Sequence, residues 1–176
     1  MKDKSIIPTD KEIVLRDDEF IVSKTDPKGR ITYGNGVFIE FSGYPERDLL
    51  GVQHNIVRHP DMPRAVFNLL WDHIKERKEI FAFIKNLCRD GSYYWVLANV
   101  TPSVDAQNNL LGYYSVRRKP SRKAISVVTD LYRDMLQAEK QAGSRDAIEV
   151  STDLLHARLK EKGVSYERMV LSLQAL

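Results

Sequence analysis

The pattern of hydrophobic positions divides the first third of the chain into short strands and short helices. Residues 20–25 and 30–33 are β-type runs, and residues 26–29 between them have the composition of a turn. These three segments predict a β-hairpin. Residues 35–42 and 45–51 carry apolar side chains at helical spacing and stop at glycines, which predicts two short helices.

The next part of the chain predicts one longer helix followed by three strands. Residues 64–78 carry their apolar side chains on one side, as in an amphipathic helix that covers a sheet. Residues 80–87, 93–104 and 110–117 are β-type runs joined by turn-forming residues, which predicts an antiparallel meander. Together with the hairpin, these elements predict an α+β domain at residues 19–119.

The two ends of the chain have different patterns. Residues 1–18 are mostly charged around one apolar patch at residues 12–15, and we expect this leader to cap another element. Residues 120–176 are helical by pattern, with three apolar stripes of which Gly143 and Gly163 close the first two. The stripes suit packing on one another, on the sheet or across a dimer, and the sequence leaves these arrangements open. We expect this helical extension to serve partner binding or self-association.

Length and charge narrow the class of protein. A chain of 176 residues is long enough for one substantial core plus an appendage. Its 27 basic and 24 acidic residues give a net charge of +3, which does not favour nucleic-acid binding. The single cysteine, Cys88, excludes an internal disulfide and suits a reducing compartment, so the cytoplasm is the expected location. No apolar run approaches the roughly 20 residues of a spanning helix, so direct membrane insertion is not expected.

Residues 54–63 bring two imidazoles, a guanidinium and a carboxylate together within ten residues of an expected loop. Arg58 and His59 can donate to a diphosphate or to ring carbonyls, and Asp61 can accept from a ribose or an adenine. The alternative is that Asp61 caps the helix beginning near Pro63 while Arg58 pairs with it at the surface.

Three further side chains are candidates for the same site. Asn86 lies in an otherwise apolar run, so its amide needs a partner if it points inward; a ligand, a neighbouring strand and a water molecule are all open. Asn35 stands at the mouth of a short helix, where an amide is usually a cap. Trp71 is on the apolar face of the long helix, where core packing is the plain expectation.

Three stretches of this sequence carry a family resemblance. They resemble the PAS domain of bacterial aerotaxis and energy-taxis receptors, which bind FAD. The three stretches are HNIVRHPDMP, FNLLW and FIKNLCRDGSYYWVLANVTP. The resemblance covers residues 19–119. It implies the PAS fold, a five-stranded antiparallel sheet with short helices and one longer helix on one face. It implies cofactor-binding roles for the following residues: Asn35, Arg58, His59, Asp61, Phe67, Trp71 and Asn86.

The sequence departs from that family in two respects. Ile80 stands where the family has an aromatic residue, and the chain has no membrane anchor or signalling hairpin. It is therefore similar to short soluble PAS proteins that work with a membrane-bound partner of the methyl-accepting chemoreceptor type. The expected function is an FAD-binding redox or energy sensor in aerotaxis, cytoplasmic and reaching the membrane only through its partner. Self-association through the helical extension would give a homodimer.

Other functions are less favoured by the sequence. Light-sensing LOV domains have a cysteine where this chain has Ile56, so no thiol adduct is expected. A haem-binding PAS gas sensor remains an alternative, with His54, His59 and His73 as the candidate ligands by type. A cofactor-free PAS interaction module is the other alternative. An enzyme is not expected, because His59 and Asp61 are not accompanied by a nucleophile, a phosphate-binding loop or a metal cluster.

Overall fold

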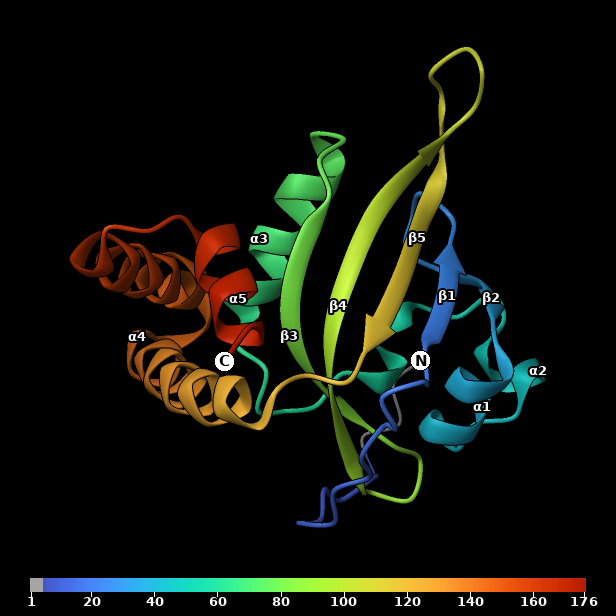
Figure 1. Ribbon diagram of the computed structural model, residues 1–176, viewed down its shortest axis with the longest axis horizontal. Helices are drawn as coiled ribbons and strands as arrows, with labels where there is room; N and C mark the ends of the chain where they lie inside the picture. The colour runs from blue at the N-terminus through green and yellow to red at the C-terminus, as the bar shows by residue number, and fades with distance from the viewer. Residues whose placement is uncertain (1–4) are drawn as a thin grey trace.

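The fold is built on a five-stranded antiparallel sheet (Figure 1). The computed structural model describes residues 5–176, with strands β1 (Ile21–Thr25), β2 (Ile31–Gly34), β3 (Ile80–Leu87), β4 (Tyr93–Val104) and β5 (Leu110–Arg118). Their order in the sheet is β2-β1-β5-β4-β3. The predicted hairpin and meander are both present, and β1 joins them by pairing with β5. The α+β class and the five-stranded sheet are confirmed.

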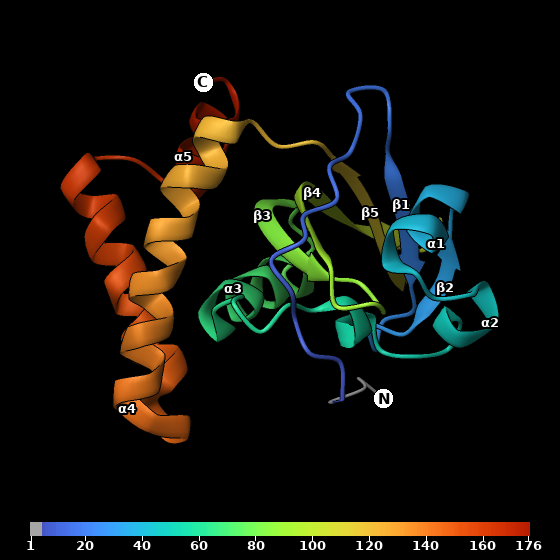
Figure 2. The same cartoon turned by 90° about the horizontal axis from the view of Figure 1, so that it is seen from below.

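Four helical segments lie on one face of the sheet (Figure 2). They are α1 (Gly36–Ser42), α2 (Glu46–Leu49), the 3₁₀ turn η1 (His54–Val57) and α3 (Arg64–Lys75). The longer helix ends three residues before the predicted boundary, since Arg77 has a φ of 62° and the chain turns there toward β3. The helical face and the sheet enclose a region lined by four of the candidate residues, namely Arg58, Phe67, Trp71 and Asn86.

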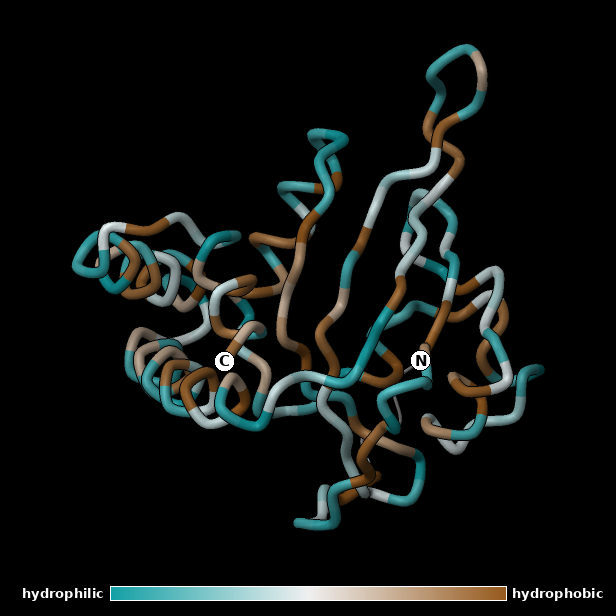
Figure 3. Tube along the Cα trace, viewed as in Figure 1, coloured by the Kyte–Doolittle hydropathy of each residue, from teal (hydrophilic) through white to brown (hydrophobic). Residues whose placement is uncertain are grey.

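Strands β3 and β4 are buried on both faces, because helices cover one face and the two ends of the chain cover the other. Ile84 and Asn86 point toward the helices, whereas Phe83 and Trp95 point the opposite way and are buried there. Figure 3 shows the hydrophobic residues gathered on these strands, with a hydrophilic turn between α3 and β3.

The leader extends the sheet beside the first residues of β4. The Ile13 amide donates to the Tyr93 carbonyl at 2.7 Å, and the Tyr93 amide donates to Lys11 at 2.9 Å. Leu15 is fully buried in the core. Residues 1–4 lie outside the described part of the chain, so the structure addresses only residues 5–18 of the predicted cap.

The C-terminal extension packs against its own domain. It consists of α4 (Arg122–Lys162) and α5 (Tyr166–Gln174), and α4 is broken at Gly143, which has φ 74° and ψ 177°. These helices flank α3 and the β3 edge of the sheet (Figures 1 and 2). Of the three arrangements that the sequence leaves open, packing on one another and on the sheet are both present. Within residues 5–176, no helix is both long and apolar enough to span a membrane.

Candidate functional site

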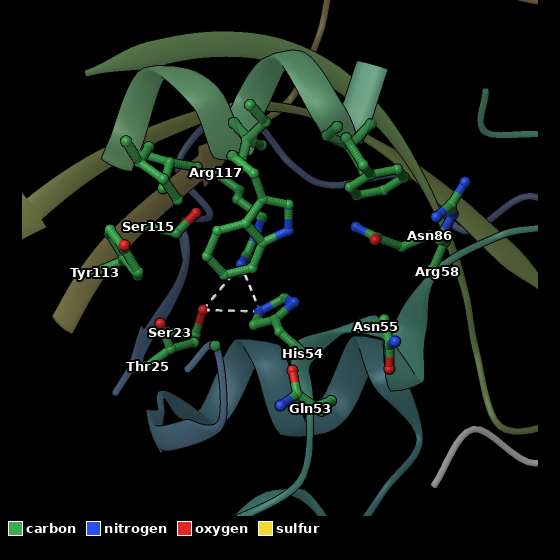
Figure 4. Close-up of a pocket in the computed structure, with 18 residues that line it drawn as sticks. Ser23, Thr25, Gln53, His54, Asn55, Arg58, Asn86, Tyr113, Ser115 and Arg117 are labelled. Carbon is green, nitrogen blue, oxygen red and sulfur yellow. Dashed lines mark hydrogen bonds between the residues drawn. The ribbon is translucent and has the colours of Figure 1, made fainter. Parts of the chain in front are cut away.

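A cavity of about 160 Å³ lies between the helical face and the sheet (Figure 4). Its walls come from β1, η1, α3, β3, β4 and β5, so every part of the domain except α1, α2 and β2 contributes. One region of the wall is apolar and the other is strongly polar. Such a combination is typical of a pocket that binds a small molecule in a fixed orientation.

The apolar region is a slot between α3 and the sheet. The helix contributes Phe67, Leu70, Trp71 and Ile74 at helical spacing, and the strands contribute Ile84, Ala98 and Val100. The turn between β1 and β2 approaches the indole so closely that a Cβ added at Gly29 would lie 2.8 Å from Trp71 Cη2. Gly29 also has a φ of +77°, so a glycine is required there for both reasons. The Trp71 ring meets Tyr113 edge to face at 5.6 Å, which fixes its orientation over the slot.

Arg58 and Asn86 both line the cavity and are paired through their backbones. Their main chains form an isolated antiparallel bridge, which ties the segment after η1 to the open edge of β3. The Arg58 guanidinium lies 4.2 Å from the centre of the Phe67 ring and donates to the Met62 carbonyl at 3.0 Å. Burial lowers the pKa of Arg58, an effect that Glu139 on α4 opposes.

The side-chain amide of Asn86 points into the cavity (Figure 4). Asn86 is only 4% exposed, and its amide makes no hydrogen bond to another residue within the described chain. Neither a neighbouring strand nor a side chain satisfies it. The amide is therefore available to a molecule inside the cavity.

At the polar region, three side chains from separate elements meet. The Arg117 Nη2 group donates to Ser23 Oγ at 2.8 Å and to His54 Nε2 at 2.7 Å. Burial and the adjacent guanidinium lower the pKa of His54 to about 3, so its ring is neutral at pH 7. Since a guanidinium can only donate, Nε2 accepts and the imidazole proton resides on Nδ1.

Arg117 is a buried cation that has no carboxylate partner among residues 5–176. It is 5% exposed, and burial lowers the pKa of Arg117 to about 10, so it remains charged at pH 7. Its Nη1 group has no hydrogen-bond partner among residues 5–176, and neither does the buried Ser115 Oγ beside it on β5. Leaving such groups unpaired in a protein interior is costly, so this part of the wall is suited to a ligand rich in acceptors.

Two of the predicted site residues turn away from the cavity. His59 is buried against Tyr93, its amide donates to the Lys85 carbonyl at 3.4 Å, and its Nδ1 accepts from the Asp61 amide at 3.1 Å. Asp61 is 58% exposed in its side chain and binds Lys85 Nζ at 2.6 Å. Neither residue lines the cavity. The alternative, a cap and a surface ion pair, is wrong, because Asp61 makes no cap and Arg58 makes no ion pair with it within the described chain.

Asn35 lies outside the cavity and caps α1. Its Oδ1 accepts from the amides of Phe38 and Val22, both at 3.0 Å, and its Nδ2 donates to the Phe20 carbonyl at 2.8 Å. Its polar atoms are thus committed to the backbone. Arg58, Phe67, Trp71 and Asn86 line the cavity, whereas Asn35, His59 and Asp61 support the elements around it. A cofactor-binding role for these seven residues stays a prediction.

Three further residues singled out from the sequence, Ile80, Cys88 and His73, do not line the cavity. Ile80, which replaces the expected aromatic, is buried in a small cluster with Ile74, Val100 and Tyr113. Cys88 is a buried thiol whose pKa is raised to about 11 by burial, so it is a poor nucleophile. His73 lies off the cavity, with its Nδ1 2.9 Å from the Leu69 carbonyl. In residues 5–176 no three histidine, cysteine or carboxylate side chains are grouped to hold a metal ion.

The polar region of the cavity was missed by the sequence reasoning. Arg117, Ser115 and Tyr113 occupy alternate positions of one predicted strand, so the period-two rule assigns them to one face. That signal was present, but the sequence does not say which face is buried. For His54 the sequence predicts membership of the polar cluster at residues 54–63 and a possible haem-ligand role, and no contact with Arg117.

The five-stranded sheet, the helices on one face and the enclosed cavity are those of a PAS domain. Residues 31–117 match the family described as PAS fold, and this part of the chain is a PAS domain. The resemblance drawn from the sequence is confirmed.

Two relatives are similar to this chain in sequence. The Aerotaxis receptor of Escherichia coli (strain K12) is 38% identical over 125 residues, which is 71% of this chain and 24% of that receptor. The Nitrogen fixation regulatory protein of Klebsiella pneumoniae is 29% identical over 97 residues, 55% of this chain and 20% of that protein. The chain thus spans about a quarter or less of these relatives, which are a receptor and a regulator.

Among solved structures, a light-oxygen-voltage domain studied with a flavin analogue is similar in fold. It has a TM-score of 0.53 and 20% identity, and the match covers 70% of this chain and 87% of that chain. This likeness concerns the fold alone.

Proposed function

We propose that the protein is an FAD-binding PAS sensor that reports redox state to a partner of the chemoreceptor type. The observation that carries the proposal is the Asn86 amide, buried at 4% exposure and facing an aromatic slot without a partner. An isoalloxazine ring combines a flat apolar body with an edge of alternating donors and acceptors. A buried amide and a slot between Trp71 and Ile84 suit both properties.

The residues of this chain would hold the cofactor in distinct ways. Phe67, Trp71 and Ile84 exclude water from the slot, and Asn86 offers both a donor and an acceptor to the ring. Arg58, stacked on Phe67 near the surface, supplies positive charge for a diphosphate. When bound, a flavin supplies reversible electron acceptance, and the protein contributes its orientation and its electrostatic surroundings. No catalytic step is required of the chain.

Haem is a weaker candidate because its possible ligands are already engaged. His54 is the one histidine in the cavity lining of residues 5–176, and its Nε2 lies 2.7 Å from the Arg117 guanidinium. An iron ion there would have to displace a buried cation. A cofactor-free interaction module is also disfavoured, since such a pocket would leave Asn86, Ser115 and Arg117 permanently unsatisfied.

Strand β3 offers a route from the cavity to the extension. Asn86 faces the cavity, and three residues earlier the Phe83 carbonyl accepts a hydrogen bond from Tyr132 of α4 at 2.9 Å. A change in the hydrogen bonds at Asn86 can shift the strand and thereby alter how α4 packs. We propose that residues 120–176, with or without the leader at residues 5–18, carry this change to a membrane-bound partner or to a second copy. The protein would then act in the cytoplasm, in aerotaxis or energy taxis.

The test begins with the absorbance spectrum of the purified protein, followed by chromatography of the released cofactor. Flavin bands with FAD as the released species are expected. Asn86→Ala should reduce the flavin per polypeptide several-fold. Asn99→Ala is the matched control, because Asn99 lies on neighbouring β4 and donates to Glu79 at 3.0 Å away from the cavity.

Two outcomes would contradict the proposal. A Soret band, or no visible absorbance even after incubation with FAD, would show that the cavity does not take a flavin. Equal flavin content in Asn86→Ala and Asn99→Ala would show that the flavin is held elsewhere.

A further inference from the structure

The proposed contacts of the flavin with Asn86, Phe67 and Trp71 assign no role to Arg117. It is a buried charge whose nearest polar partners are neutral: the Ser23 hydroxyl and the unprotonated Nε2 of His54. The guanidinium also lies 5.5 Å from the centre of the Phe38 ring. No carboxylate pairs with it anywhere in residues 5–176. A buried cation is ordinarily paired, so this one lacks the negative charge that would balance it.

The surroundings hold the guanidinium in position without satisfying it. Nη2 is used twice, whereas Nη1 has no partner, and the residue lines the cavity (Figure 4). Phe38 and His54 stack at 5.6 Å with their planes 8° apart, which keeps the imidazole rigid beneath the arginine. This arrangement fixes a positive charge and a vacant donor before any ligand arrives.

Arg117 and Asn86 contact different parts of the cavity. Arg117 on β5 is level with Ala98 of β4, whereas Asn86 on β3 is level with Tyr94, four residues earlier on the same strand β4. A flavin ring that is bound by Asn86 at one edge can therefore present a different edge to Arg117. Ser115 Oγ, also unpaired, lies two residues from Arg117 on the same face of β5.

We infer that Arg117 faces the acceptor-rich edge of the bound flavin and raises its redox potential by favouring the reduced, negatively charged ring. The inference deepens the proposed function and rests on it. Reduction by an external donor such as dithionite adds two electrons and one proton to the neutral oxidised ring, which leaves one negative charge on it. A fixed cation in a water-poor cavity stabilises that product more than the neutral oxidised ring.

Arg58 is not suited to the same role. It lies near the surface, and Glu139 of α4 is close enough to oppose the effect of burial on its pKa. Its charge is thus partly balanced before a ligand binds. We expect Arg58 to influence affinity, and Arg117 to influence the preference for one redox state.

The experiment measures the midpoint potential of the flavin-loaded full chain by dithionite titration with reference dyes. Arg117→Met removes the charge while keeping a long side chain, and Arg117→Lys restores a charge. Arg118→Met is the control, since Arg118 is the next residue on β5 and is exposed on the opposite face. Arg117→Met should weaken the preference for the reduced form about tenfold or more, or about 30 mV downward for a two-electron couple. Arg117→Lys should recover most of that shift, and Arg118→Met should not move the potential.

The outcomes separate this inference from the function on which it rests. If wild-type protein takes up no FAD, both are wrong. If flavin is bound and Arg117→Met keeps the wild-type potential, only the inference about Arg117 is wrong. If Arg117→Met does not retain flavin, the dissociation constants of oxidised and reduced FAD are measured by titration. A loss at least tenfold greater for the reduced form supports the inference, and an equal loss for both overturns it.

Discussion

The cavity and the junction between α3 and the C-terminal extension both bury polar side chains, and the two regions differ in how their key polar groups are paired. At the junction, the Glu139 carboxylate of α4 accepts from the Ala65 amide at 3.1 Å, and Tyr132 donates to the Phe83 carbonyl at 2.9 Å. In the cavity, Asn86, Ser115 and Arg117 each keep a polar group without a partner among the described residues.

The difference separates structural polar groups from those suited to a ligand. An unpaired buried donor costs about 1–3 kcal/mol, a large share of the marginal stability of a small domain. At the junction, Glu139 and Tyr132 avoid that cost and attach the extension to the domain, although the buried Ser151 hydroxyl of α4 has no partner among the described residues. The cavity bears that cost at Ser115 and Arg117, and the Asn86 amide also makes no hydrogen bond there to a described residue, which is consistent with a site that is completed by a bound molecule.

The largest effect should come from breaking the junction at Glu139. Helix α3 begins after Pro63 and has no capping side chain of its own within the described chain, so Glu139 satisfies its second amide from the tail. Glu139→Ala removes a charged hydrogen bond and leaves that buried amide unpaired. The free energy of unfolding in urea should fall by about 2–3 kcal/mol.

Two variants serve as comparisons for Glu139→Ala. Glu139→Gln keeps an acceptor and should lose less, about 1 kcal/mol. Glu149→Ala changes an exposed carboxylate of the same helix and should alter stability by less than about 0.5 kcal/mol. Equal losses in Glu139→Ala and Glu149→Ala would mean that the junction does not depend on this contact.

The junction also marks the limit of what the sequence could predict. Strand alternation and helical spacing are local signals, so the sheet, α3 and the lining residues Trp71 and Asn86 were accessible. The orientation of His59 and Asp61 was not, because it follows from the pairing of their short segment with the distant edge of β3. The capping of α3 by Glu139 joins positions 74 residues apart, and no local pattern reports such a contact.

A second, intermediate effect should appear at the polar end of the cavity in acid. The pKa of His54 is held at about 3, below its ordinary value of 6.5, so between these values the unfolded chain binds a proton that the folded chain does not. Stability therefore falls as the pH is lowered from 6.5 toward 3. Replacing His54 by Gln should reduce the loss of unfolding free energy between pH 7 and pH 4.5 by about 1–2 kcal/mol.

The control for His54→Gln is His156→Gln, since His156 is exposed on α4. Its acid sensitivity should match that of the wild-type protein. If His54→Gln also lost stability in acid as steeply as the wild-type protein, His54 would not be the neutral acceptor of the Arg117 guanidinium.

The smallest effect should have opposite signs with and without the cofactor, and it tests the comparison most directly. Asn86→Leu replaces an unpaired amide by an apolar side chain of similar size, next to Ile84 on the same face of β3. In protein stripped of flavin, this change should raise the free energy of unfolding by up to about 1 kcal/mol, because no buried polar group is left unsatisfied. With excess FAD the wild-type protein should become the more stable of the two, since a ligand that binds only the folded state stabilises it more the higher its affinity.

The control variant Asn99→Leu should show no such reversal, because Asn99 already donates to Glu79 outside the cavity. An Asn86→Leu variant that is less stable than the wild-type protein in both states would mean that the Asn86 amide is already satisfied in the flavin-free fold.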